Sequence, residues 1–252
     1  MKNYLPVLNN ISHDLRNGRS IYDGYIRGWG IQFGDLREQV RKDPLYKKAL
    51  ALSSGRTVVS EDNRINLYLI LRFYLDKVGT GDIIEFGSYR GGNAIFLAHI
   101  VDQLYPGTKV YSLDTFAGMP TTNSEIDAHQ PGDFGGVDLD ELRRFTVASG
   151  LQNLEFVQGL FQDTAPAVLS RAKNIVLAHI DCDIYSSVAY SYEIVKAHMA
   201  AGGYLVFDDA TVSSCLGATE VVESTLIRRD GLNSEQIFPQ FVFRVGLHES
   251  GD

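Results

Sequence analysis

The sequence predicts an α/β fold, in which a doubly wound, mostly parallel sheet of seven strands carries helices on both faces. From Ser60 onward, short apolar runs of strand length alternate with longer apolar patterns of helical period, which is typical of βαβ units. Five such units are followed by two short apolar runs on either side of Pro239-Gln240. A link this short requires an antiparallel pair, so the last two strands should run in opposite directions.

Each predicted element has a local signal. Continuous apolar runs such as DIIEFG and NIVLAHI indicate strands that are buried on both faces. Ser60 and Asp138 are typical N-cap residues, and Gly150 and Gly202-Gly203 are typical of helix ends. We therefore expect helices at about 60–75, 94–104, 138–150, 164–172, 186–200 and 216–229. The expected strands are 82–87, 109–113, 153–158, 174–180, 204–207, 236–238 and 241–245.

The first 59 residues differ from the rest of the chain. Asn and Gly residues interrupt every apolar pattern before Asp35, and a helix is then expected over 36–42, with a break at Asp43-Pro44 and a continuation to Leu52. The first 60 residues carry 10 basic and 5 acidic side chains, whereas the remainder is strongly acidic. We interpret residues 1–59 as an irregular, partly helical lid or oligomerisation segment, which leads us to expect a homo-oligomer. The alternative is that both charged faces are simply solvated.

Composition excludes several classes of protein. The net charge of −8 argues against nucleic acid as a partner, because binding to phosphates needs clustered Lys and Arg. No apolar stretch approaches the ~20 residues of a transmembrane helix, and the N-terminus lacks the apolar region of a secretory signal. Two cysteines, Cys182 and Cys215, are too few for a disulfide scaffold or a cysteine-based zinc site. We therefore expect a cytoplasmic protein that binds no membrane.

The first predicted strand ends in a glycine-rich turn, EFGSYRGG, at residues 85–92. The dinucleotide fingerprint G-x-G-x-x-G fails here, because Tyr89 stands at its middle glycine and would obstruct a pyrophosphate. Glu85, two residues before Gly87, suits a cationic ligand better than a phosphate. A turn without any ligand is the alternative.

The second predicted strand ends at Asp114, whose carboxylate could accept both hydroxyl groups of a ribose. The alternative is that Asp114 caps the following turn. Together with the glycine turn, the ribose interpretation points to a nucleoside that lacks phosphates and carries a positive charge. S-adenosylmethionine meets this description.

Four acidic residues stand at the ends of two further strands: Asp181 and Asp183 in HIDCDIY, and Asp208 and Asp209 in FDDA. Carboxylates gathered at one sheet edge repel one another unless they are protonated or bind a cation. Hard oxygen ligands select Mg²⁺, or another hard divalent ion, over zinc. Solvated caps are the alternative for any one pair. A buried, hydrogen-bonded role is the simpler expectation for His179 than metal or base chemistry.

These motifs, with SLDTFAGMP and GLFQDTAP, resemble the macrocin O-methyltransferase family over about residues 60–246. The resemblance implies a class I methyltransferase-like fold for residues 60–252. It also implies a metal- and S-adenosylmethionine-dependent enzyme that methylates a sugar hydroxyl of a glycosylated natural product, with a small-molecule glycoside as its partner.

The family's residue roles carry over to matching positions of this sequence. Asp181, Asp208 and Asp209 are then the metal ligands, and Asp183 is the general base. The residues implied to bind the cofactor are Glu85, Phe86, Gly87, Ser88, Gly91, Asp114 and Phe161.

A more distant resemblance links the chain to catechol-type methyltransferases, which often place a lysine base where this chain has Ile184. This departure favours a sugar over a phenolic acceptor. A non-catalytic cofactor-binding protein is the alternative from another class, and the retained acidic motifs argue against it. The long loop at 117–137 is interpreted as a second part of the lid.

Overall fold

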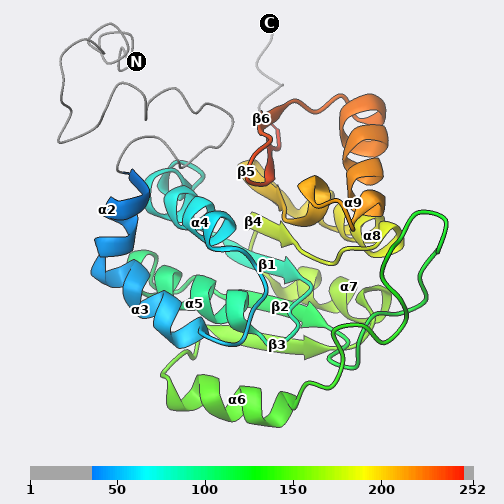
Figure 1. Ribbon diagram of the computed structural model, residues 1–252. Helices are drawn as coiled ribbons and strands as arrows, with labels where there is room; N and C mark the ends of the chain where they lie inside the picture. Colours follow the sequence, from blue (N-terminus) through cyan, green and yellow to red (C-terminus); the bar gives the residue numbers. More distant parts are fainter. Residues whose placement is uncertain (1–35, 247–252) are drawn as a thin grey trace, which may run out of the picture.

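A seven-stranded sheet lies between two layers of helices in the computed structural model, which describes residues 36–246 (Figure 1). The strand order is β3-β2-β1-β4-β5-β7-β6. The first five of these strands are parallel, and β7 is antiparallel to both β5 and β6. The predicted fold class and the antiparallel terminal pair are therefore confirmed. The irregular segment predicted before Asp35 lies outside the described residues.

The strands are β1 (Asp82–Phe86), β2 (Val110–Asp114), β3 (Leu154–Gln158), β4 (Ile175–Ile180), β5 (Met199–Phe207), β6 (Ser234–Gln236) and β7 (Phe241–Arg244). The α-helices are α2 (Leu36–Lys42), α3 (Pro44–Ser53), α4 (Glu61–Phe73), α5 (Gly92–Leu104), α6 (Leu139–Ala148), α7 (Phe161–Arg171), α8 (Tyr185–Val195) and α9 (Leu216–Glu220). A π-helical stretch, Val221–Arg229, continues α9.

Successive side chains of each strand point to opposite faces of the sheet, so the sheet contributes to two apolar cores. Ile83 of β1 packs into the core beneath α3, α4 and α5, whereas its neighbour Ile84 packs into the core beneath α7, α8 and α9. Helix α6 covers β3 through a smaller third cluster. No helix within residues 36–246 is long and apolar enough to cross a membrane.

Helix α3 belongs to the main core, although it precedes residue 60. Its Tyr46 is fully buried and meets the rings of Tyr68 and Phe96 edge to face, with centroids 5.4 and 5.7 Å away. Asp43 caps the helix through a hydrogen bond from the Leu45 N–H, and Pro44 is its first residue, which confirms the predicted break. Among the residues described, the segment before residue 60 therefore has no separate core of its own.

The structure corrects the interpretation of Gly202-Gly203 as a helix end. Helix α8 ends at Val195, followed by a single 3-10 turn, and β5 already begins at Met199. Gly202 has φ +75°, and the pairing of β4 with β5 shifts register here, so the glycines form a bulge inside the strand. Helix α7 also begins three residues earlier than expected, and β6 two residues earlier.

Gly87, at the end of β1, has no room for a side chain. It has φ +94°, and an added Cβ would lie 1.6 Å from the carbonyl oxygen of Asp181. We expect Gly87→Ala to destabilise the fold by about 2–3 kcal/mol, because the backbone beneath the site must shift. Gly107 is a matched control: it has φ +91° but no described atom within 4 Å of its added Cβ. Urea unfolding of both variants measures the difference, and equal losses would show that backbone strain alone is responsible.

Candidate active site

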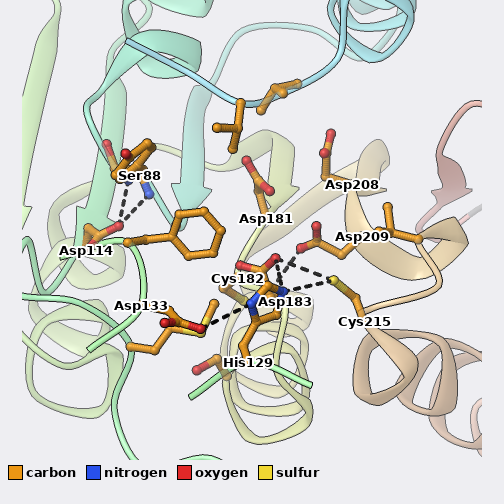
Figure 2. A pocket seen from close by; sticks show the side chains of 18 of the residues that line it. Ser88, Asp114, His129, Asp133, Asp181, Cys182, Asp183, Asp208, Asp209 and Cys215 are labelled. Atoms are coloured by element: carbon orange, nitrogen blue, oxygen red, sulfur yellow. Dashed lines mark hydrogen bonds and ion pairs between the residues drawn. The ribbon is translucent and has the colours of Figure 1, made fainter. Parts of the chain in front are cut away.

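A cavity of about 740 Å³ opens where the parallel strands β1, β2, β4 and β5 end (Figure 2). Eight of the predicted site residues line it: Gly87, Ser88, Asp114, Phe161, Asp181, Asp183, Asp208 and Asp209. This position agrees with the rule that open parallel sheets bind ligands beyond the carboxyl ends of their strands. Further walls come from the loop between β2 and α6, the segment before α4 and the segment between β5 and α9.

Three predicted cofactor residues, Glu85, Phe86 and Gly91, are not among the lining residues. Glu85 is fully buried and accepts hydrogen bonds from Asn93 Nδ2 (2.8 Å) and Ser112 Oγ (2.6 Å). Phe86 packs into the core beneath α7, α8 and α9, where its ring meets that of Phe161 edge to face. Gly91 forms the left-handed N-cap of α5. These residues therefore support the wall from behind.

Asp114 is bonded to the glycine turn. Its Oδ2 accepts from the backbone N–H groups of Ser88 (2.7 Å) and Tyr89 (2.8 Å), and its Oδ1 accepts from that of Phe116 (2.7 Å). The turn-capping role that the sequence left open is thus present, and the carboxylate also faces the cavity (Figure 2).

Two polar atoms of the cavity wall have no partner among the residues described. They are Ser88 Oγ and Asn93 Oδ1, and both are buried. Buried polar groups in proteins are nearly always hydrogen-bonded, so these atoms fit a polar ligand at the end of β1. Ser88 lies beside Asp114, to which its N–H donates, and this position suits a nucleoside cofactor.

Asp181, Asp208 and Asp209 converge on one point, with their nearest oxygens all within 4.8 Å of one another. Burial, and then the charges of Asp208 and Asp209, raise the pKa of Asp181 well above its ordinary value. Burial and the charges of Asp183 and Asp208 likewise raise the pKa of Asp209. A divalent cation would offset this repulsion, so the set fits a hard ion such as Mg²⁺.

Behind these carboxylates lies His179, fully buried in β4 as expected. Its Nδ1 lies 3.4 Å from Glu85 Oε1 and its Nε2 lies 3.2 Å from Asp208 Oδ1. Burial opposes protonation of the imidazole, but hydrogen bonds and charges from Asp208 and Glu85 outweigh it and raise the pKa of His179 to about 9. The ring is therefore a buried cation that fixes the carboxylate of Asp208.

Asn63 and Gln240 also hold Asp208. Both side-chain amides donate to its Oδ1, Asn63 from 3.0 Å. Sequence reasoning missed both residues, because they come from distant segments and belong to no motif. The only local signal was Ser60-x-x-Asn63, where Ser60 Oγ caps α4 through the Asn63 N–H.

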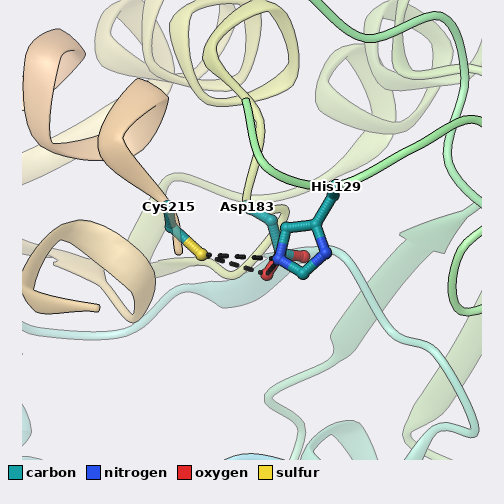
Figure 3. Close-up of side chains that lie close together, drawn as sticks. All are labelled: His129, Asp183 and Cys215. Carbon is teal, nitrogen blue, oxygen red and sulfur yellow. Dashed lines mark hydrogen bonds and ion pairs between the residues drawn. The ribbon is translucent and has the colours of Figure 1, made fainter. Parts of the chain in front are cut away.

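Asp183 belongs to a different cluster from Asp181. The strand alternation that would place both side chains on one side ends at Ile180, because Asp183 has φ +57° and turns its carboxylate toward His129 and Cys215 (Figures 2 and 3). Its N–H donates to Asp209 Oδ2 at 2.9 Å, which ties the two clusters together. Burial raises the pKa of Asp183, and His129 opposes that rise.

The loop at 117–137 forms one wall of the cavity and is anchored at several points. Asp127 accepts from the Tyr185 N–H at the start of α8 (2.9 Å), and the Met119 N–H donates to Asp133 O (2.8 Å). These contacts place His129 beside Asp183, which follows it by 54 residues in the sequence.

Residues 55–226 match the profile of the family described as Macrocin-O-methyltransferase (TylF). The chain belongs to this family. The match confirms the resemblance drawn from the motifs and the enzyme class that it implies, an S-adenosylmethionine-dependent O-methyltransferase.

Individual relatives and solved structures are more distant from this chain. The 8-demethyl-8-(2,3-dimethoxy-alpha-L-rhamnosyl)-tetracenomycin-C 4'-O-methyltransferase of Streptomyces olivaceus is 26% identical over 177 residues, which cover 66% of this chain and 67% of that protein. The O-methyltransferase NovP has a TM-score of 0.62 at 19% identity, covering 83% of this chain and 94% of NovP. MycE methyltransferase, solved with Mg, SAH and mycinamycin VI, has a TM-score of 0.51 at 14% identity, covering 100% of this chain and 66% of MycE. Both structures share the fold.

The clustered carboxylates of this macrocin O-methyltransferase family member predict a pH-dependent response to Mg²⁺. Asp181 and Asp209 have raised pKa values, so their contribution to the stability of the metal-free protein is full below about pH 4 and is lost as the pH rises. We expect a fixed Mg²⁺ concentration, set at 100 times the Kd measured at pH 8, to stabilise the protein by about 2.7 kcal/mol near pH 8, and by less at pH 5, where protons compete for the carboxylates. Thermal unfolding in Mg²⁺ and in EDTA measures this, with Asp181→Asn as the control. An equal gain at both pH values would contradict the prediction.

Proposed function

We propose that this enzyme transfers a methyl group from S-adenosylmethionine to a sugar hydroxyl of a glycosylated natural product, with a divalent metal ion at Asp181, Asp208 and Asp209. The observation that carries the proposal is the convergence of these three carboxylates beside Asp183 in one cavity. The names of family relatives support the substrate class, since the Streptomyces olivaceus protein methylates a rhamnosyl tetracenomycin. We further propose a homo-oligomer located in the cytoplasm.

Asp183 serves as the general base in this proposal. A carboxylate of ordinary pKa, near ~4, is a poor base for a sugar hydroxyl, so the burial that raises the pKa of Asp183 improves the match. When bound, the cofactor supplies an electrophilic methyl group, and the metal ion lowers the pKa of a substrate hydroxyl. The side chain of Asp183 then holds the proton that the hydroxyl loses.

The remaining residues position the reactants and exclude water. Asp181, Asp208 and Asp209 would hold the metal ion, and a metal ion that binds neighbouring substrate oxygens would favour a vicinal diol as acceptor. Ser88 and Asp114 hold the cofactor at the other end of the cavity. The loop at 117–137 acts as a lid over the reacting groups, where orientation can contribute on the order of 7–11 kcal/mol.

Asp114→Ala should weaken S-adenosylmethionine binding by about 1–3 kcal/mol, the usual cost of losing a charged hydrogen-bond partner. The same change leaves the N–H groups of Ser88 and Tyr89 without their acceptor, so it should also lower the unfolding midpoint. Calorimetric titration with the cofactor measures the first effect. Asp138→Ala is a control, because Asp138 caps α6 outside the cavity and should cost stability alone. Unchanged cofactor affinity in Asp114→Ala would contradict the role of Asp114.

The function itself is tested by S-adenosylhomocysteine release. The purified protein is given a panel of deoxysugar glycosides and, separately, catechols, each with Mg²⁺ and with EDTA. We expect release with glycosides in Mg²⁺ only. Turnover of catechols alone would favour the phenolic alternative, full turnover in EDTA would exclude the metal role, and cofactor binding without any turnover would favour a non-catalytic protein.

A further inference from the structure

A second cluster of metal-binding side chains lies beside the three carboxylates. His129 Nε2 and Asp183 Oδ1 are 3.5 Å apart, Cys215 Sγ is 3.5 Å from the same Asp183 oxygen, and Cys215 Sγ is 3.8 Å from His129 Nε2 (Figure 3). The three side chains come from the 117–137 loop, the end of β4 and the residue before α9. Each also lines the cavity.

The separations between these donor atoms match those around a zinc ion. Zinc binds nitrogen and oxygen at about 2.0–2.2 Å and sulfur at about 2.3 Å, so tetrahedral ligands lie about 3.3–3.6 Å from one another. The observed 3.5, 3.5 and 3.8 Å need only a small closure of Cys215 toward His129. A thiolate and an imidazole also favour zinc over Mg²⁺, whereas the neighbouring all-oxygen set favours Mg²⁺.

The surroundings of His129 point to the same kind of ligand. A histidine that binds a metal usually directs its other ring nitrogen toward a carboxylate, which fixes the ring. Here Nδ1 lies 3.5 Å from Asp133 Oδ2, and that carboxylate is itself held by the Gln130 N–H at 2.9 Å. Three protein ligands facing a cavity leave a fourth position open, as in zinc sites that bind water or another ligand.

We propose that His129, Asp183 and Cys215 form a zinc site separate from the Mg²⁺ site, and that zinc bound there inhibits methyl transfer by occupying Asp183. The inhibitory part rests on the proposed role of Asp183 as the base, whereas binding does not. Burial and the charges of Asp209 and Asp183 raise the pKa of Cys215, so the metal-free side chain is a thiol. Zinc replaces the thiol proton, which passes to solvent as the zinc–sulfur bond forms.

Cobalt(II) is the probe for binding, because a cobalt–thiolate bond gives a charge-transfer band in the near ultraviolet. The 252-residue chain, kept in saturating Mg²⁺, is titrated with Co²⁺. We expect this band in the wild type and in Asp181→Asn, which alters only the Mg²⁺ site. Cys215→Ser and His129→Gln should lose it or weaken it strongly. Cys182→Ser is the matched control, because this second thiol is directed into the core toward Ser191 and should leave the band intact.

Zinc inhibition is then measured against each variant's own zinc-free rate. We expect the inhibitory zinc concentration to rise at least about 10²-fold in Cys215→Ser, more than the 10–100-fold typical of losing an outer-shell partner. Absence of the thiolate band in the wild type, or its loss in Cys182→Ser alone, would overturn the site. A band without zinc inhibition would overturn the inhibitory part. If zinc-free Asp183→Asn kept normal turnover while the wild type showed the band, the proposed base would fail and the zinc site would stand.

Discussion

Replacing His179 by alanine is expected to destabilise the fold by about 3–5 kcal/mol, a large part of the total stability of a typical domain. The imidazolium lies between Glu85 and Asp208 with no exposure to solvent. Without it, two carboxylates remain in the interior with their charges uncompensated, and a cavity the size of the ring is left. Denaturation in urea at pH 7 measures the loss.

His198 provides the control, because it is exposed in the 3-10 turn after α8 and its one hydrogen bond among the residues described is to the Ile194 carbonyl. His198→Ala should change the stability by no more than about 0.5 kcal/mol. A loss below 1 kcal/mol in His179→Ala would contradict the buried ion triad.

The same triad gives a pH dependence with a definite sign. The pKa of His179 is raised to about 9, above its unfolded value near ~6.5. The contribution of protonated His179 to the free energy of unfolding is therefore full below about pH 6.5 and is lost as the pH rises through 9. The difference in stability between the wild type and His179→Ala should shrink between these limits. A difference that grows with pH would show that the ring is neutral in the folded protein.

The sequence predicted most of the sheet because buried parallel strands leave a strong signal. Runs such as DIIEF and IVLAHI are typical of buried strands, and the acidic residues that follow β4 and β5 had to meet at one sheet edge. Gly202-Gly203 was ambiguous, because a helix end and a bulge both require a residue with positive φ. Local pattern alone could not choose between them.

Local sequence patterns could not predict the hydrogen-bond partners of the site residues. Asn63 reaches Asp208 across 145 residues, and only the packing of α4 on the sheet brings the two together. The left-handed backbone of Asp183 could not be predicted from any pattern, since positive φ is uncommon for residues other than glycine, although Asp adopts it more often than most. Backbone strain of this kind is typical of functional sites. The left-handed conformation also places Asp183 in a different cluster from Asp181, which strand alternation did not predict.

This separation gives the second large effect. Asp183→Asn should lower kcat by about 10²–10⁴, the usual contribution of a general base, because the amide keeps the shape and loses the basicity. The contacts of the side chain with His129 and Cys215 can persist. Because Asp183 lies outside the cluster of Asp181, Asp208 and Asp209, the affinities for Mg²⁺ and for the cofactor should change little.

Asp181→Asn is the variant with which the Mg²⁺ dependence of Asp183→Asn is compared. It removes one of the three proposed ligands of the metal ion, so it should raise the Mg²⁺ concentration needed for half-maximal activity by at least about 10²-fold, whereas Asp183→Asn should not. Asp140→Asn, on α6 with a side chain 77% exposed, controls for the loss of one negative charge. Steady-state rates over a Mg²⁺ series separate the three variants. If Asp183→Asn kept its turnover, or lost Mg²⁺ as completely as Asp181→Asn, the base and the metal ligands would not be the distinct groups that the two clusters indicate.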